Sequence, residues 1–175
     1  EVIALLKGMK SLDLQPYVDK VSDEPLMKEA PKGGKIVSEK EGEIYGSTKL
    51  VLSNGVTVYI KKTDFKADEI RMKATSLGGK SLFPDKDALN FAVMDNVVAV
   101  GGLGNFSQVD LTKVLAGKKV SVRAGLGATT ENVFGTCSPK DFETMMQLTY
   151  LTFTAPRKDM EAFESYKNRT KAELE

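Results

Sequence analysis

The chain has 175 residues, of which 41% are hydrophobic, and it carries 25 lysine and arginine residues against 24 aspartate and glutamate residues. Such a chain can bury a core, its balanced charge provides no net field that would attract nucleic acid, and it has no apolar run near the ~20 residues that span a bilayer. It contains no histidine, which excludes a Ser-His or Cys-His nucleophile pair, a histidine-bearing zinc site and a histidine proton shuttle within this polypeptide.

Residues 1–47 differ in composition from the rest of the chain. They hold half of the six prolines and several glycines, and only residues 2–9 and 12–21 are apolar enough for short helices. Proline and glycine interrupt regular structure. We therefore predict a linker with short helices that otherwise runs extended along a surface.

Strands follow from residue 49. The apolar runs 50–52 and 56–60 flank Asn54-Gly55, and Asn-Gly between β-branched runs predicts a hairpin with a type I′ turn. A third strand is expected over residues 69–76, where apolar and polar side chains alternate, so that one face is buried and the other faces solvent.

Residues 85–100 have the length of a helix, and nearly every position is apolar. A helix that is apolar almost all round is expected to be buried on more than one side. Its polar exceptions include Asp95 and Asn96, which either bond to a neighbouring strand or the linker, or remain from a lost site. The pair Gly101-Gly102 ends this helix.

Further elements follow in the second half of the chain. Ser107 and Asp110 predict a capping box that opens a short helix to about residue 116, and residues 119–126 and 131–137 alternate as strands. Ser138-Pro139 then predicts the start of a helix to about residue 153. Its apolar stripe consists of Phe142, Met145, Met146, Thr149 and Phe153.

The last predicted element is an amphipathic helix after Pro156. The order of elements predicts an α+β fold, a two-layer sandwich in which a mixed, mostly antiparallel sheet carries helices on one face. The single cysteine, Cys137, has no histidine to activate it, so we expect a half-buried structural residue.

Two segments resemble a known family. The sequence Leu-Ser-Asn-Gly-Val-Thr-Val at 52–58 resembles the opening hairpin of the pitrilysin/insulinase family of zinc metallopeptidases. Ala-Thr-Ser-Leu-Gly-Gly at 74–79 resembles the strand and turn that follow it, and the likeness extends over residues 48–175. Residues 1–47 resemble the connector between the two halves of the long bacterial members.

The resemblance also implies where a metal site would have been. Catalytic members carry an inverted His-x-x-Glu-His on the helix that ends before a Gly-Thr, and aligning Gly101 with that glycine puts Ala92, Asp95 and Asn96 at the His, Glu and His positions. Glu173 stands near the position of the distal glutamate ligand. One carboxylate without imidazoles does not hold catalytic zinc, so the resemblance implies no catalytic, cofactor-binding or metal-binding residue in this chain.

The family therefore implies a role in a longer protein. We expect a catalytically silent domain, not an enzyme on its own, that supports the catalytic half of the same parent chain and helps to enclose peptide substrate in a chamber. Zinc would be held in that catalytic half, and the parent would be a periplasmic or otherwise extracytoplasmic bacterial protein.

Two alternatives from other classes stay open. One is a structural scaffold, like the related core subunits of the respiratory cytochrome complex. The other is a stand-alone peptide-binding module that uses an exposed sheet edge.

Overall fold

The computed structural model describes residues 24–43 and 45–175. The predicted helices at 2–9 and 12–21 lie outside these ranges. In chain order the elements of the described part are β1 (Ile36–Glu41), β2 (Thr48–Leu52), β3 (Thr57–Ile60), β4 (Ile70–Leu77), η1 (Gly79–Leu82), η2 (Asp85–Asp87), α2 (Ala88–Gly101), α3 (Gln108–Val114), β5 (Val120–Leu126), β6 (Thr130–Cys137), η3 (Pro139–Asp141), α4 (Phe142–Thr154) and α5 (Met160–Leu174).

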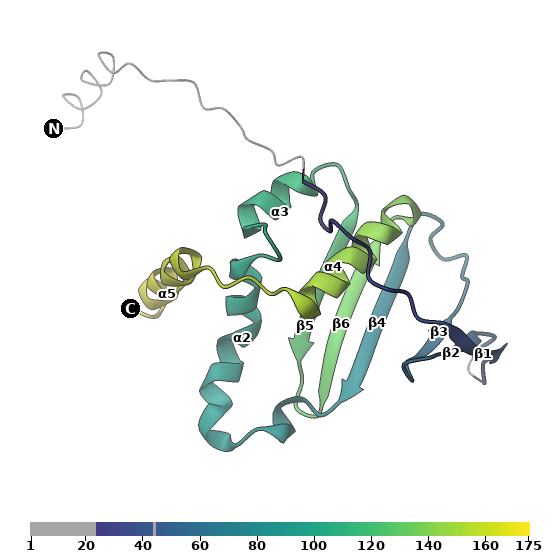
Figure 1. The fold of residues 1–175 in the computed structure, drawn as a ribbon. Helices are drawn as coiled ribbons and strands as arrows, with labels where there is room; N and C mark the ends of the chain where they lie inside the picture. Colours follow the sequence, from purple (N-terminus) through teal and green to yellow (C-terminus); the bar gives the residue numbers. More distant parts are fainter. Residues whose placement is uncertain (1–23, 44) are drawn as a thin grey trace, which may run out of the picture.

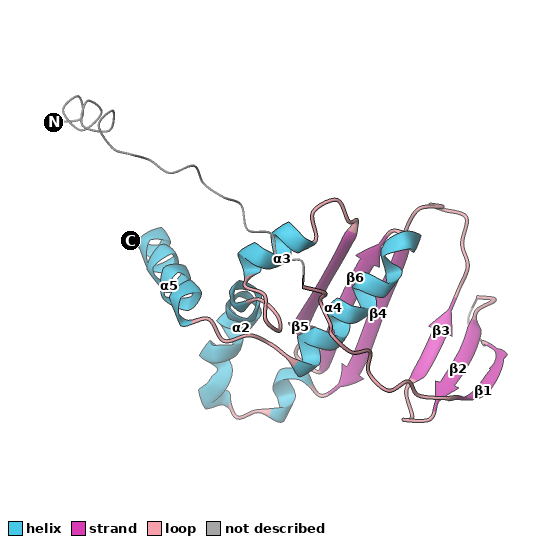
Figure 2. Ribbon diagram, turned by 45° about the horizontal axis from the view of Figure 1, so that its top comes forward, coloured by secondary structure: helices cyan, strands magenta, loops and turns pink. Residues whose placement is uncertain are grey.

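The strands form two antiparallel sheets, with the orders β1-β2-β3 and β4-β6-β5. Helix α4 lies across one face of the second sheet (Figures 1 and 2). The predicted α+β class is confirmed. The single sheet of the prediction is instead divided, since the described part of β3 pairs with β2 and not with β4.

The first sheet departs from the sequence prediction in two details. Strand β1 lies within the predicted linker, where it pairs with β2. The predicted hairpin of β2 and β3 is present, but a type I′ turn requires positive φ at both central residues, and Asn54 is not among the residues with positive φ. Of the two residues, only Gly55 has positive φ (+87°). The Leu52 N–H donates to Val56 O and the Gly55 N–H donates to Leu52 O, each over 2.9 Å. Residues 53–55 therefore form a three-residue loop that ends in a left-handed glycine.

Close contact with the second sheet explains the buried stripe of α4. A Cβ atom on Gly135 would lie 2.7 Å from Sδ of Met145, which is fully buried. The predicted stripe was wrong at Phe142, Met146 and Phe153, which are 45%, 42% and 66% exposed. The buried positions are Thr144, Met145, Leu148 and Leu151.

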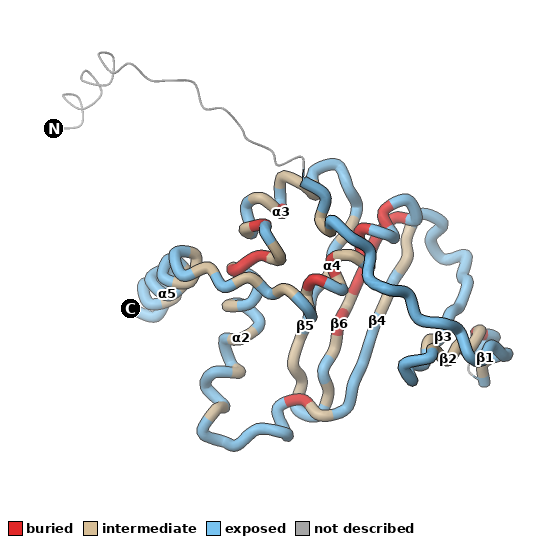
Figure 3. The backbone as a smooth tube through the Cα atoms, in the orientation of Figure 1, coloured by how far each residue is buried: buried red, intermediate tan, exposed pale blue. Residues whose placement is uncertain are grey.

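Helix α2 is mostly exposed (Figure 3), so the prediction that it is buried on more than one side was wrong. Only its last residue, Gly101, is buried, whereas Leu89 is 84% exposed and Val93 and Val98 are about 40% exposed. In the described chain α2 contacts α5, β5, α3 and the short turn η2 before it, and these contacts leave most of its residues exposed.

The end of α2 is fixed by contacts between backbone segments. A Cβ atom on Gly101 would lie 2.1 Å from Arg157 O, and one on Gly102 would lie 2.2 Å from Phe106 O. Gly102 also has φ +82°. Neither position accepts a larger residue unless the backbone shifts.

The start of α4 is tied to β5 by a buried carboxylate. Asp141 Oδ2 accepts hydrogen bonds from the Ser138 hydroxyl (2.6 Å) and from the Lys119 N–H (2.9 Å). These bonds, the Ser138 bond foremost, lower the pKa of Asp141 below its ordinary value of 3.8. Nearby Cys137 is fully buried rather than half-buried, and burial raises the pKa of its thiol.

Replacing Gly102 with alanine is expected to lower the free energy of unfolding by more than about 3 kcal/mol, because strain at positive φ is added to a backbone clash. Gly117→Ala is the matched control, since Gly117 has φ +79° but open space around it, and should cost only about 1 kcal/mol. Urea unfolding followed by circular dichroism measures both. Equal losses would show that the contact with Phe106 does not constrain the chain.

Asp141→Asn should destabilise the protein at neutral pH, with a difference that shrinks as the pH falls below the ordinary aspartate value. A carboxylate whose folded pKa is lowered stabilises the fold above its unfolded pKa, and this stabilisation is lost as the pH falls through the folded pKa. Urea midpoints between pH 7 and pH 2.5 provide the measurement, with the exposed Asp64→Asn as control. A difference that is independent of pH would contradict the role given to the charge.

Candidate functional site

The three positions predicted for a lost metal site all lie on α2. Ala92, Asp95 and Asn96 are spaced by three and four residues, so they share one side of the helix. All three are exposed. Glu173 lies on α5, which packs against α2.

Asp95 also lines a cavity of about 690 Å³ beside the second sheet. Its Oδ2 atom lies 3.8 Å from the position that a Cβ atom on Gly125 of β5 would take. The cavity lies between α2, α3, α4 and the second sheet, and its walls are mainly apolar. Residues that contribute apolar side chains to it include Met94, Val98, Leu111, Leu115, Val122 and Leu148.

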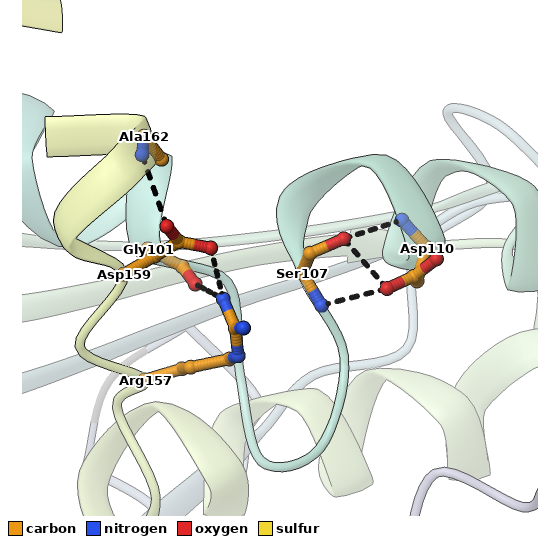
Figure 4. A network of polar contacts seen from close by, with 6 residues as sticks. All are labelled: Gly101, Ser107, Asp110, Arg157, Asp159 and Ala162. Carbon is orange, nitrogen blue, oxygen red and sulfur yellow. Dashed lines mark hydrogen bonds and ion pairs between the residues drawn. The ribbon is translucent and has the colours of Figure 1, made fainter. Parts of the chain in front are cut away.

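A polar network fixes the C-terminal end of α2 (Figure 4). Arg157 donates to Gly101 O over 3.2 Å and forms an ion pair with Asp159. Asp159 in turn caps α5 by accepting from the Ala162 N–H over 2.9 Å. The Ala162 bond first, and the Arg157 bond second, lower the pKa of Asp159, so this carboxylate is held ionised as a structural group.

The adjacent capping box of α3 is present as predicted. Ser107 Oγ accepts from the Asp110 N–H, and the Asp110 carboxylate accepts from the Ser107 N–H, each over 3.1 Å. The hydrogen bond from the Ser107 hydroxyl lowers the pKa of Asp110 most. The two carboxylates near the end of α2 therefore have structural roles: Asp159 caps α5, and Asp110 completes the capping box of α3.

The α2 residues do not fit a catalytic zinc ion. Ala92 offers no donor atom, Asn96 offers an amide, and Asp95 offers the single carboxylate of the three. Within residues 24–43 and 45–175, no group of three or more His, Cys, Asp or Glu side chains is placed to hold a metal ion. What the site can provide is an apolar cavity, an exposed helix surface and a rigid helix end.

One cluster was not found from the sequence. On the face of the second sheet opposite α4, Lys73, Phe134 and Arg123 stand in one row across β4, β6 and β5. The alternation of apolar and polar residues over 69–76 correctly predicted that the Lys73 side chain faces solvent. To predict that these three residues are neighbours also requires the register in which β4, β6 and β5 pair. Alternation within a single strand does not give that register.

No family model matches the chain. A protein of Arabidopsis thaliana described as a PqqL-like zinc protease is 24% identical over 158 residues, which cover 90% of this chain and 16% of that protein. The periplasmic protease PqqL from Escherichia coli has the same fold over 96% of this chain and 18% of its own, with a TM-score of 0.75 and 22% identity. The ferredoxin protease FusC, solved as a point mutant in complex with Arabidopsis ferredoxin, matches 94% of this chain and 18% of its own, with a TM-score of 0.70 and 18% identity.

The chain therefore resembles a zinc protease in sequence over most of its length, and it shares the fold of one region of two larger proteases. It spans less than a fifth of the length of each of these relatives. In the part of the chain that the structure describes, no helix is both long and apolar enough to cross a membrane.

The alignment of α2 with a metal-binding helix can be tested by building the missing ligands. The triple change Ala92→His, Asp95→Glu and Asn96→His places two imidazoles and a carboxylate on one exposed side of α2, and we expect it to bind zinc. Affinity should be roughly 10–100-fold below that of a natural site, because the groups that would orient the imidazoles are missing. Isothermal titration with zinc chloride measures it.

The matched control is the triple variant Asn90→His, Ala92→His and Asp95→Glu, in which Asn96 is kept. One imidazole then lies on another side of the same helix. The unaltered chain should keep no stoichiometric zinc after dialysis. A folded triple variant that binds zinc no better than this control would contradict the alignment. Adding Glu173→Gln then tests whether the distal carboxylate contributes to binding.

Proposed function

We propose that this chain is a catalytically silent domain of a zinc metallopeptidase of the pitrilysin type. In this proposal it supports the catalytic half of the same parent chain and helps to enclose peptide substrate. The zinc ion belongs to that catalytic half, because Ala92, Asp95 and Asn96 provide no imidazole. The domain comprises residues 48–175, and residues 1–47 connect it to the rest of the parent.

The observation that carries this proposal is the exposure of α2. Leu89 is 84% exposed on a helix whose residues are apolar almost throughout. Contiguous exposed apolar surface marks an interaction site in a soluble protein. A helix of this composition fits a domain whose apolar surface is covered by other parts of a longer protein.

The similarity to larger proteases, one of which is described as a zinc protease, supports the identity of that longer protein. Each of the relatives contains this region as less than a fifth of its length. The periplasmic location of the Escherichia coli relative supports an extracytoplasmic location for the parent. A scaffold role without a peptide substrate predicts the same exposed helix, so the test must include proteolysis.

The test is to place charge on α2 in the parent protein and in the isolated chain. Leu89→Glu with Val93→Glu should change the free energy of unfolding of the isolated chain by no more than about 0.5 kcal/mol, as expected for exposed positions. The same pair should lower the thermal stability and the peptidase activity of the parent, because it buries two charges at the contact.

Asn90→Glu is the control, since it adds charge to α2 without removing apolar surface. Differential scanning fluorimetry and cleavage of a fluorogenic peptide provide the two measurements. A parent protein that remains stable and active with both glutamates would contradict the proposal. Lowered stability with unchanged cleavage would favour the scaffold alternative.

A further inference from the structure

The face of the second sheet opposite α4 carries an aromatic ring between two cations. Lys73, Phe134 and Arg123 are direct neighbours across the three strands. Lys73 Nζ lies 5.7 Å from the centre of the Phe134 ring, and Arg123 Cζ lies 4.9 Å from it. Both distances are within the range of cation–π attraction, so the ring holds the two cations on either side of it.

The strand residues of the rows on either side of this one include no carboxylate, and the Asp95 carboxylate of α2 lies beside the Gly125 end of one of them, 3.8 Å from the Cβ position of Gly125. One consists of Arg71, Thr136 and Ser121, and the other of Thr75, Asn132 and Gly125. Among the described residues, Lys73 and Arg123 form no ion pair, whereas Arg71 is paired with Glu69 over 2.8 Å. The central row of Lys73, Phe134 and Arg123 therefore presents unpaired positive charge, and the rows beside it add hydroxyl and amide groups.

This face is open to a ligand. Helix α4 covers the other side of the sheet (Figures 1 and 2). Lys73 and Arg123 are exposed. The residues of the central rows line an open depression of about 420 Å³ that includes Ser121, Phe134 and Thr136.

The spacing of the cations suits an extended peptide. The two unpaired cations, Lys73 on β4 and Arg123 on β5, lie two strand spacings, or about 10 Å, apart on either side of Phe134. Alternate side chains of an extended peptide repeat about every 7 Å, and the long, flexible side chains of Lys73 and Arg123 accommodate the difference. Arg123, whose Cζ lies 4.9 Å from the centre of the Phe134 ring, forms no ion pair among the described residues, so its N–H groups can bind a carboxylate in bidentate fashion.

We propose that this face, centred on Lys73, Phe134 and Arg123, binds an extended acidic peptide with glutamate or aspartate at alternate positions. The inference does not depend on the proposed function. A nucleic acid is the less favoured ligand, because the chain as a whole has 25 cations against 24 anions and provides no long-range field. The positive charge is confined to one small face.

The experiment measures peptide binding to the 175-residue chain by fluorescence anisotropy. The probe is a labelled ten-residue peptide of alternating glutamate and threonine, compared with the same peptide carrying glutamine for glutamate. A labelled oligothymidylate of equal charge is the third probe. We expect the glutamate peptide to bind at least tenfold more tightly than the other two.

Variants locate the binding on the sheet face. Lys73→Gln with Arg123→Gln should raise the Kd of the glutamate peptide roughly tenfold, as the loss of central charged contacts typically does. Phe134→Leu should weaken binding as well, because Arg123 loses the ring that holds it. Lys86→Gln with Lys158→Gln, which removes two exposed cations elsewhere, should leave the Kd within twofold.

Three results would overturn the proposal. The first is equal binding of the glutamate and glutamine peptides. The second is an equal loss of affinity in the Lys73→Gln, Arg123→Gln variant and in the Lys86→Gln, Lys158→Gln control. The third is tighter binding of the oligothymidylate than of the glutamate peptide, which would assign the face to nucleic acid. Circular dichroism confirms that each variant is folded before its binding is interpreted.

Discussion

The close contact of backbone segments at Gly101 and Gly102 determines how the helices of this chain are arranged. Here the end of α2, the start of α3 and the segment before α5 approach within distances that exclude a Cβ atom. Arg157 joins two of these segments by its bond to Gly101 O and its ion pair with Asp159. Because three elements are positioned at one point, a change there displaces all of them together.

This arrangement also explains why α2 is exposed. The helix is fixed at its C-terminal end, where Gly101 and Gly102 are buried, while Leu89 near its other end lies in solvent. The apolar cavity beside α2 is bounded by the second sheet and α3 but is not filled by described side chains. An apolar helix next to an apolar cavity is the form expected of a domain that contributes one side of an interface and receives the other side from elsewhere.

Local signals predicted most of the elements, and contacts distant in sequence account for the errors. The Ser107 capping box marked the start of α3, and Ser138-Pro139 marked the 3₁₀ turn η3 that leads into α4, although Ser138 makes no side-chain cap bond. Both signals depend on residues within one turn. The exposure of α2 could not be predicted, since apolar composition indicates that a helix needs cover but not whether this chain provides it. The row of Lys73, Phe134 and Arg123 required the register of three strands, and the metal-site alignment of Ala92, Asp95 and Asn96 stays a prediction.

The burial of Cys137 has a practical consequence. Its side chain lies on the central strand of the second sheet next to Asp141, and only 3% of the residue is exposed. A thiol reagent reaches this sulfur only when the strand opens, and the raised pKa of the thiol makes its direct attack on the reagent slow in the folded state. The rate at which a thiol reagent labels Cys137 therefore reports how often the second sheet opens locally. This measurement needs no introduced cysteine or other probe.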